Sequence, residues 1–282
     1  MRTELVRIET RGDPLDGALY TPDAALAQGG ALLMHGNVGN FYTGPSRFLP
    51  PRLAEAGLAC LAFNRRGHDI LVNHVGRRVD GGAFQTTEEG LEDNDAAAGF
   101  LAAKGFGEPI VVGHSNGGML AAHFAAAHPE TAALVLLSAQ RGGPRNDRVG
   151  PPNMVNGAPL LAGERHEEAL VEAERLVADG RPDELMLLPG WWRVISAASL
   201  VDRAYRTPET VAAAPQVRCP SLFVRGELER ADVYPAEAFS ERCAGPCDVV
   251  AAAGCDHWYT GHEDMVATLV ARWLIRTLRL AR

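Results

Sequence analysis

The chain alternates short apolar runs with segments in which apolar residues recur every three or four positions. Short apolar runs between turn residues are typical of buried strands, and the wider spacing is typical of helices. The runs predict strands at residues 4–9, 15–22, 31–34, 58–63, 110–112, 133–137, 221–224 and 249–252. The spaced segments predict helices at residues 46–56, 88–104, 116–128, 235–243 and 262–280. Such an alternation predicts an α/β fold with a mostly parallel central sheet flanked by helices.

Three segments depart from this alternation. The first two predicted strands flank the turn residues 12–14, Gly-Asp-Pro, which favours an antiparallel start. Residues 68–86 contain glycines and little periodicity, so we expect a loop there. Near residue 140 the pattern breaks into a stretch rich in Gly, Pro, Asn and Arg, and helical segments follow to about residue 213. Residues 140–213 are therefore predicted to be an insertion into the sheet.

Charge and cysteine content exclude several classes of function. The chain has 282 residues, a formal net charge of -8 and a pI of about 5.6. This balance attracts neither nucleic acid nor an anionic membrane surface, so we expect no such partner. The first residues lack the apolar core of a signal peptide, and no stretch approaches the roughly 20 apolar residues of a spanning helix. A cytoplasmic protein is expected, with its five cysteines reduced and no metal bound, because their spacing matches no common zinc pattern. The oligomeric state is not readable from the sequence.

The sequence Gly-His-Ser-Asn-Gly at residues 113–117 stands between a predicted strand and a predicted helix. A G-x-S-x-G motif in this context is a nucleophile elbow, a turn so sharp that the serine is held in a strained conformation with its hydroxyl exposed. Residues two positions to either side come too close for a β-carbon, which explains Gly113 and Gly117. The N–H groups at the start of the following helix favour negative charge. Ser115 is the predicted nucleophile.

With these features the chain resembles the α/β-hydrolase superfamily, as a serine-nucleophile, esterase-like member, over nearly its whole length. The resemblance implies an α/β-hydrolase fold with a core domain of residues 1–139 and 214–282. It also implies that residues 140–213 form the variable helical cap, or lid, of the family. No metal or organic cofactor is implied, and the partner expected is a small-molecule substrate.

Serine is a weak nucleophile without an adjacent base. The resemblance places that base in the loop after the last strand, where this chain reads Gly-Cys-Asp-His-Trp at residues 254–258. His257 is therefore the expected base. His262 is the second choice among nine histidines, and His114 is expected to be buried support within the elbow.

An acid must orient the imidazole of the base and stabilise its charged form. In the family this acid follows the penultimate strand, commonly as an Asp or Glu three residues beyond a strand-end glycine. Counting three from Gly226 gives Glu229, with Asp232 and Glu227 as alternatives. The resulting chain order, Ser then Glu then His, agrees with the family.

The negative charge that develops on the substrate oxygen needs two preorganised donors. The resemblance assigns them to the backbone N–H groups of Asn116, which follows the nucleophile, and of Asn37. Asn37 lies in a glycine-containing stretch, residues 35–42, where the backbone can approach a ligand closely. Residues 64–69, Asn-Arg-Arg-Gly-His-Asp, resemble a family segment that supports the active-site loops.

Four aromatic residues are candidates for the substrate-binding wall. Phe41 and Tyr42 directly follow the oxyanion loop, and Trp191 and Trp192 lie in the predicted cap. Adjacent residues on a helix face different directions, so at most one tryptophan is expected to point at the site. The cap also begins with arginines that could hold an anionic substrate group, with a solvated loop as the favoured alternative: Arg141, Arg145 and Arg148.

These features together predict a hydrolase that cleaves a carboxylic ester, or a related thioester or lactone, through an acyl-enzyme on Ser115. The same catalytic groups also serve pathway-specific lactonases, thioesterases and C–C bond hydrolases. A non-hydrolytic lyase or a ligand-binding member of the fold remains a further alternative, since one fold supports many chemistries.

Overall fold

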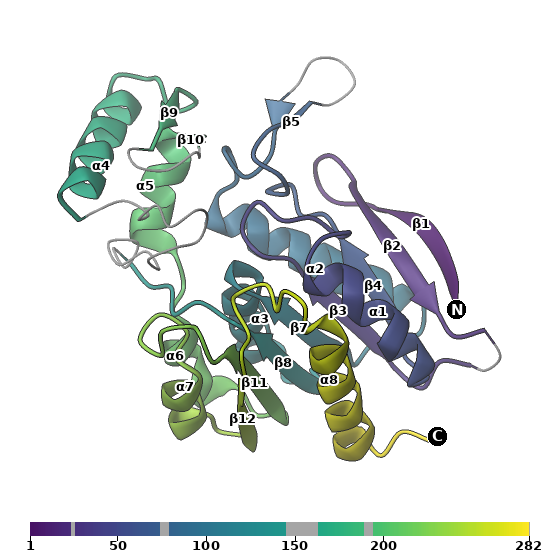
Figure 1. Cartoon of the computed structure of the whole chain (residues 1–282). Coiled ribbons are helices and arrows are strands. Elements are labelled where there is room, and N and C mark those ends of the chain that lie inside the picture. Colours follow the sequence, from purple (N-terminus) through teal and green to yellow (C-terminus); the bar gives the residue numbers. More distant parts are fainter. Residues whose placement is uncertain (24–25, 74–78, 145–162, 189–193, 282) are drawn as a thin grey trace.

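The computed structural model describes residues 1–23, 26–73, 79–144, 163–188 and 194–281. A central sheet of eight strands has the order β1-β2-β4-β3-β7-β8-β11-β12 (Figure 1). These strands are β1 (Arg2–Ile8), β2 (Leu15–Thr21), β3 (Gly30–Met34), β4 (Ala59–Phe63), β7 (Ile110–His114), β8 (Ala133–Leu137), β11 (Ser221–Gly226) and β12 (Cys247–Ala252). Each predicted strand is thus present to within a few residues at its ends.

Strands β4, β3, β7, β8, β11 and β12 are parallel, and the hairpin of β1 and β2 joins them antiparallel through β2 and β4. The predicted mostly parallel sheet with an antiparallel start is therefore confirmed. Parallel strands in one sheet all end at the same edge. The loops that follow β3, β7, β8, β11 and β12 consequently meet there, and they carry the candidate site residues.

Helices cover both faces of the sheet, as alternation along each strand requires. In β3, Ala31 and Leu33 belong to the apolar cluster beneath α1 (Pro45–Glu55) and α8 (Glu263–Leu278). Leu32 and Met34 belong to the opposite cluster, beneath α2 (Thr87–Ala103), α3 (Asn116–Ala127) and α7 (Ala236–Arg242). Because both faces are buried at β3, β4 and β8, these three strands carry no polar side chain, which is why their runs are so clear in the sequence.

The described part of the inserted block has a small apolar core of its own. It contains α4 (Gly163–Ala178), the antiparallel strands β9 (Leu185–Leu187) and β10 (Val194–Ser196), and α5 (Ala197–Arg206). A short helix α6 (Thr210–Ala213) and a 3₁₀ turn, Ala214–Gln216, lead back to the sheet. The two-stranded ribbon differs from the purely helical cap expected from the sequence, because three-residue strands are too short to leave a periodic signal.

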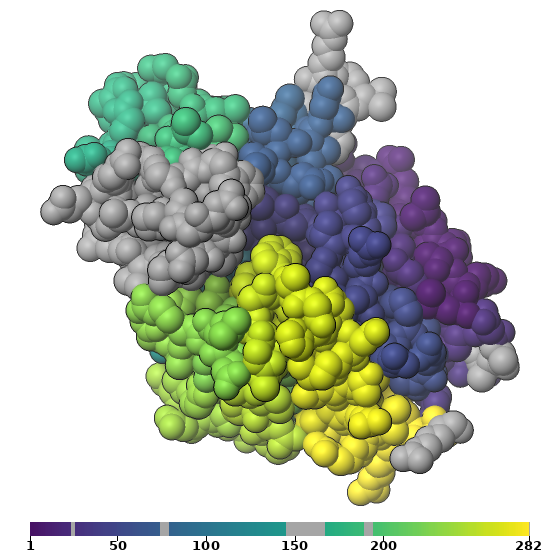
Figure 2. Space-filling model, viewed as in Figure 1, coloured from purple at the N-terminus to yellow at the C-terminus, as the bar shows by residue number. Residues whose placement is uncertain are grey.

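The inserted block lies at one corner of the molecule, above the edge where the strands end (Figures 1 and 2). The backbone N–H of Ser196 donates to the carbonyl oxygen of Ala83 at 2.7 Å. Ala83 belongs to the 68–86 segment, which also contains the two-residue strands β5 (Val72–Asn73) and β6 (Val79–Asp80), paired antiparallel rather than forming loop throughout. Over the described ranges, no helix is long and apolar enough to cross a membrane.

Candidate active site

Ser115 lies between β7 and α3 with backbone angles φ 57° and ψ -121°. A non-glycine residue rarely adopts a positive φ, and such strain persists where the surrounding structure enforces it. A β-carbon on Gly117 would collide with the carbonyl oxygens of Met34 and His35, and one on Gly113 would collide with the backbone of Gly117. The turn therefore has the geometry expected of a nucleophile elbow.

Replacing Gly117 by alanine is expected to destabilise the protein by more than about 3 kcal/mol, because the added methyl group meets rigid backbone oxygens. Gly99, in the middle of α2, is the matched control, since a β-carbon there meets nothing within 4 Å. Gly99→Ala is expected to stabilise the protein by about 0.5–1 kcal/mol. Urea denaturation measures both changes, and equal midpoints for Gly117→Ala and the wild type would contradict the packing.

His257 follows β12 and Glu229 follows β11, and their side chains are joined by a hydrogen bond. His257 Nδ1 donates to Glu229 Oε1 at 2.7 Å, and the two side chains are 9% and 4% exposed. Nδ1 therefore carries the hydrogen, and Nε2 is left as the nitrogen that can accept a proton. His257 also reaches the elbow, because its carbonyl oxygen accepts a 2.8 Å hydrogen bond from Nε2 of His114.

The alternatives for the acid and the base have other partners. Asp232 accepts a hydrogen bond from Nε of Arg230 at 2.9 Å on the surface. Glu227 accepts one from the backbone N–H of Gly254 at 2.8 Å. His262 lies at the N-cap of α8, just outside the last helix rather than within it, and its Nδ1 donates to the carbonyl of Thr260 at 3.1 Å. Of the residues considered, Glu229 is the one bonded to His257.

The second carboxylate oxygen of Glu229 is held by two further donors. The hydroxyl of Ser138 donates to Oε2 at 2.6 Å, and the backbone N–H of Gly226 donates to it at 2.7 Å. The hydroxyl oxygen of Tyr259 lies 2.8 Å from that of Ser138, and the Tyr259 hydroxyl also donates to the backbone carbonyl of Val224 at 3.1 Å. Burial raises the pKa of Tyr259 well above its usual value, which keeps that hydroxyl protonated. The carboxylate is thus oriented by three donors, from His257, Ser138 and Gly226.

Sequence reasoning missed Ser138 and Tyr259. Ser138 directly follows the buried strand β8, at the edge where ligand-binding groups of such sheets gather. Both residues have left-handed backbones, with φ of 44° and 59°. The position of Ser138 at the carboxyl end of a strand was a usable signal, whereas nothing in the sequence marks Tyr259 apart from its place two residues after His257.

The other histidines at this edge are poor candidates for a base. Burial, together with the nearby charge of His257, lowers the pKa of His114 to about 3. Burial and the charge of Arg65 lower the pKa of His35 well below its usual value. A group with so low a pKa takes up a proton poorly at neutral pH. His114 instead holds the backbone of His257 in place, as the predicted support role requires.

Residues 64–69 buttress the loop that follows β3, as predicted. Arg65 is buried, and its guanidinium donates to the carbonyl oxygen of His35. The side-chain oxygen of Asn64 accepts from the backbone N–H of Phe41 at 2.9 Å. Burial lowers the pKa of Arg65 to about 10, so the side chain remains charged at neutral pH. Its guanidinium also reaches Oδ1 of Asn116 at 3.5 Å and so links His35, which directly follows β3, to the start of α3.

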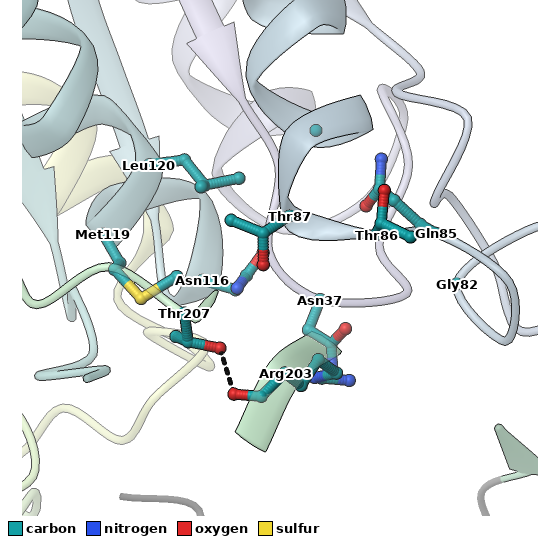
Figure 3. Close-up of a pocket in the computed structure, with 11 residues that line it drawn as sticks. Asn37, Gly82, Gln85, Thr86, Thr87, Asn116, Met119, Leu120, Arg203 and Thr207 are labelled. Carbon is teal, nitrogen blue, oxygen red and sulfur yellow. Dashed lines mark hydrogen bonds between the residues drawn. The ribbon is translucent and has the colours of Figure 1, made fainter. Parts of the chain in front are cut away.

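Asn37 and Asn116 line one pocket, between α3, the start of α2 and α5 (Figure 3). Neither backbone N–H has a hydrogen-bond partner among the residues that the structure describes. The two residues thus line one pocket, their N–H groups have no partner in the described part of the chain, and Asn116 directly follows Ser115, which is compatible with an oxyanion hole; Ser115 and His257 do not themselves line this pocket. Met119, Arg203 and Thr207 also line this pocket, and the sequence had singled out none of them.

Of the predicted substrate-binding aromatics, the two that the structure describes, Phe41 and Tyr42, do not line this pocket. Phe41 packs edge-on against Tyr42, with ring centroids 5.1 Å apart, and Tyr42 is 53% exposed. Neither lines the pocket beside Asn116, and their role in binding stays a prediction. Trp191 and Trp192 lie outside the described residues, as do Arg145 and Arg148. Arg141 forms an ion pair with Glu209, with 3.2 Å between a guanidinium nitrogen and a carboxylate oxygen.

Comparison with known proteins identifies the family of the chain. A family model described as the alpha/beta hydrolase family matches residues 31–271, and the chain belongs to that family. Its fold is similar to that of Est1E from Butyrivibrio proteoclasticus with ferulic acid bound (TM-score 0.72, 23% identity, covering 97% of this chain and 99% of that one). It is also similar to a thermostable carboxyl esterase from Bacillus coagulans (TM-score 0.70, 14% identity, 98% and 99% covered).

A third similar structure is an esterase domain from a Rhodothermus marinus protein (TM-score 0.64, 20% identity, 98% and 99% covered). At these identities the likeness concerns the fold. A comparison with curated proteins finds no match.

Proposed function

We propose that this protein hydrolyses carboxylic esters through an acyl-enzyme on Ser115, with His257 as the base and Glu229 as the orienting acid. The observation that carries the proposal is the 2.7 Å hydrogen bond between His257 and Glu229, with His257 bonded through its carbonyl oxygen to His114 of the nucleophile elbow. The names of the similar structures, two of them esterases, support an ester as the substrate. Thioesters and lactones would pass through the same kind of intermediate.

In the first half-reaction, Nε2 of His257 takes the proton of the Ser115 hydroxyl as its oxygen attacks the ester carbonyl. The oxyanion of the tetrahedral intermediate accepts hydrogen bonds from the backbone N–H groups of Asn37 and Asn116. Collapse of this intermediate breaks the bond to the alcohol, which leaves with the proton from His257. Glu229 stays ionised throughout and stabilises the imidazolium.

In the second half-reaction, a water molecule takes the place of the alcohol. His257 accepts a proton from this water as the water attacks the acyl carbonyl, and the same two N–H groups again hold the oxyanion. The intermediate then releases the carboxylic acid, and the proton returns from His257 to Ser115. Atoms and charges balance without a metal or an organic cofactor.

The test is labelling with a fluorophosphonate probe, read by mass spectrometry, together with hydrolysis of p-nitrophenyl acetate, butyrate and octanoate. The expected result is a covalent adduct on Ser115 and saturable ester turnover. Prior labelling is expected to abolish that turnover in proportion to the fraction modified. An unlabelled Ser115 combined with no turnover of any of these esters would contradict the proposal.

A further inference from the structure

Arg203 introduces a positive charge into the pocket that Asn37 and Asn116 line. Among the described residues of this lining it is the one charged side chain. Neither an ion pair nor a side-chain hydrogen bond joins it to a described residue. Other arginines in this region are paired, Arg141 with Glu209 and Arg206 with Asp202. Arg203 thus lies in the same pocket as the predicted oxyanion residues, and its guanidinium has no anionic partner among the described residues.

The position of Arg203 is fixed by the residues beside it. Oδ2 of Asp202 accepts a 2.7 Å hydrogen bond from the backbone N–H of Thr87, at the start of α2. The hydroxyl of Thr207 donates to the backbone carbonyl of Arg203 at 2.6 Å. Figure 3 shows Arg203 in the lower part of the pocket and Thr86 and Thr87 in the upper part. Arg203 is therefore held against the pocket by contacts of its own helix with the core.

The positive charge of Arg203 is opposite in sign to the net charge of the protein. With a net charge of -8, the protein gives an anionic ligand no general attraction. A guanidinium presents a planar fork of N–H groups that matches a carboxylate bidentately, and such charge-assisted pairs fix orientation as well as supplying affinity. A partly enclosed arginine whose guanidinium has no partner among the described residues is thus suited to a carboxylate supplied by the ligand.

We infer that the substrate is an ester that also carries a free carboxylate, and that Arg203 binds this carboxylate while Asn37 and Asn116 hold the reacting carbonyl oxygen. Arg203 would then be a specificity-determining residue that discriminates between acidic and neutral esters. The inference rests on the proposed function, because it names the substrate class of that same site.

The experiment compares matched chromogenic esters in the wild type and in Arg203→Gln. Mono-p-nitrophenyl glutarate carries the carboxylate on the acyl side, and its methyl ester is the neutral counterpart. The compound 5-acetoxy-2-nitrobenzoate carries it on the leaving group, with p-nitrophenyl acetate as its counterpart. We expect the wild type to favour at least one acidic ester by about 10- to 100-fold in kcat/KM, and Arg203→Gln to lose that preference.

Two further variants separate binding from structure. Arg206→Gln removes the same charge from the same helix at a residue outside the pocket lining, and its preference is expected to be unchanged. Arg203→Lys is expected to keep part of the preference, since it retains the charge but not the bidentate fork. In Arg203→Gln, the loss of kcat/KM on the acidic esters should exceed the loss on the neutral esters by about 10-fold or more, because the neutral esters present no carboxylate to the guanidinium.

The outcomes distinguish the two proposals. Neutral-ester turnover and Ser115 labelling without any preference for acidic esters would overturn the role of Arg203 and leave the esterase proposal standing. A preference that survives in Arg203→Gln, or equal losses on acidic and neutral esters in a folded Arg203→Gln, would also overturn it. Failure of both labelling and turnover would overturn the proposed function and this inference with it.

Discussion

Replacing Ser115 by alanine is expected to lower kcat for ester hydrolysis by about 10⁴- to 10⁶-fold. The alanine variant keeps the pocket and the oxyanion donors but cannot form the acyl-enzyme, so the remaining rate reflects binding and electrostatic stabilisation alone. Steady-state kinetics with p-nitrophenyl butyrate measure the change. A substitution of this size leaves the fold intact, because alanine fits wherever serine does.

Two controls make the Ser115 result decisive. Ser240→Ala, on α7 and outside the site, is expected to keep wild-type turnover. The double variant Ser115→Ala/His257→Ala is expected to be no slower than Ser115→Ala, because the two groups act as one unit. Wild-type turnover in Ser115→Ala, prepared free of contaminating esterases, would contradict the proposed acyl-enzyme mechanism.

Replacing Glu229 by glutamine is expected to lower kcat by about 10³- to 10⁴-fold. Glutamine has almost the same shape, but it carries no charge to stabilise the imidazolium of His257. The NH₂ group of the glutamine would also meet a hydrogen-bond donor in either orientation of the amide. In one orientation it faces the Ser138 hydroxyl and the Gly226 N–H, and in the other it faces the Nδ1–H of His257. The loss of activity is measured from the pH dependence of kcat/KM, both from the shape of the profile and from its maximum value.

The two other carboxylates of this loop provide matched controls for Glu229. Asp232→Asn and Glu227→Gln are each expected to stay within about threefold of wild-type kcat, since their partners are Arg230 and the backbone of Gly254. A loss in either variant as large as that in Glu229→Gln would show that the acid has been assigned to the wrong residue.

The fold could be predicted almost completely from the sequence because most of its strands are buried on both faces. Runs such as Leu32-Leu33-Met34 are apolar at every position, and each ends at a loop of distinct composition. The elbow could be predicted for a similar reason, since Gly113 and Gly117 are required by contacts within their own turn and its neighbouring strand.

The surroundings of the site could not be predicted to the same degree, because they depend on contacts between distant segments. Glu229 could be separated from Asp232 and Glu227 only by its 2.7 Å bond to a histidine 28 residues away. Arg203 reaches the pocket because Asp202 bonds to Thr87, 115 positions earlier in the chain. Periodicity and local motifs contain no information about such pairings.

The positions of the site residues along the chain determine when during synthesis the site can become complete. The elbow and both predicted oxyanion residues lie within the first 117 residues, whereas Glu229 and His257 follow the last two strands at the sheet edge. His114 and His257, which are in contact, are separated by 143 positions. Chains generally fold from the N-terminus as they emerge from the ribosome. On the proposed mechanism, a nascent chain that has not yet added β11 and β12 lacks both the base and the acid, so Ser115 is expected to become reactive only after the segment that contains His257 has been released.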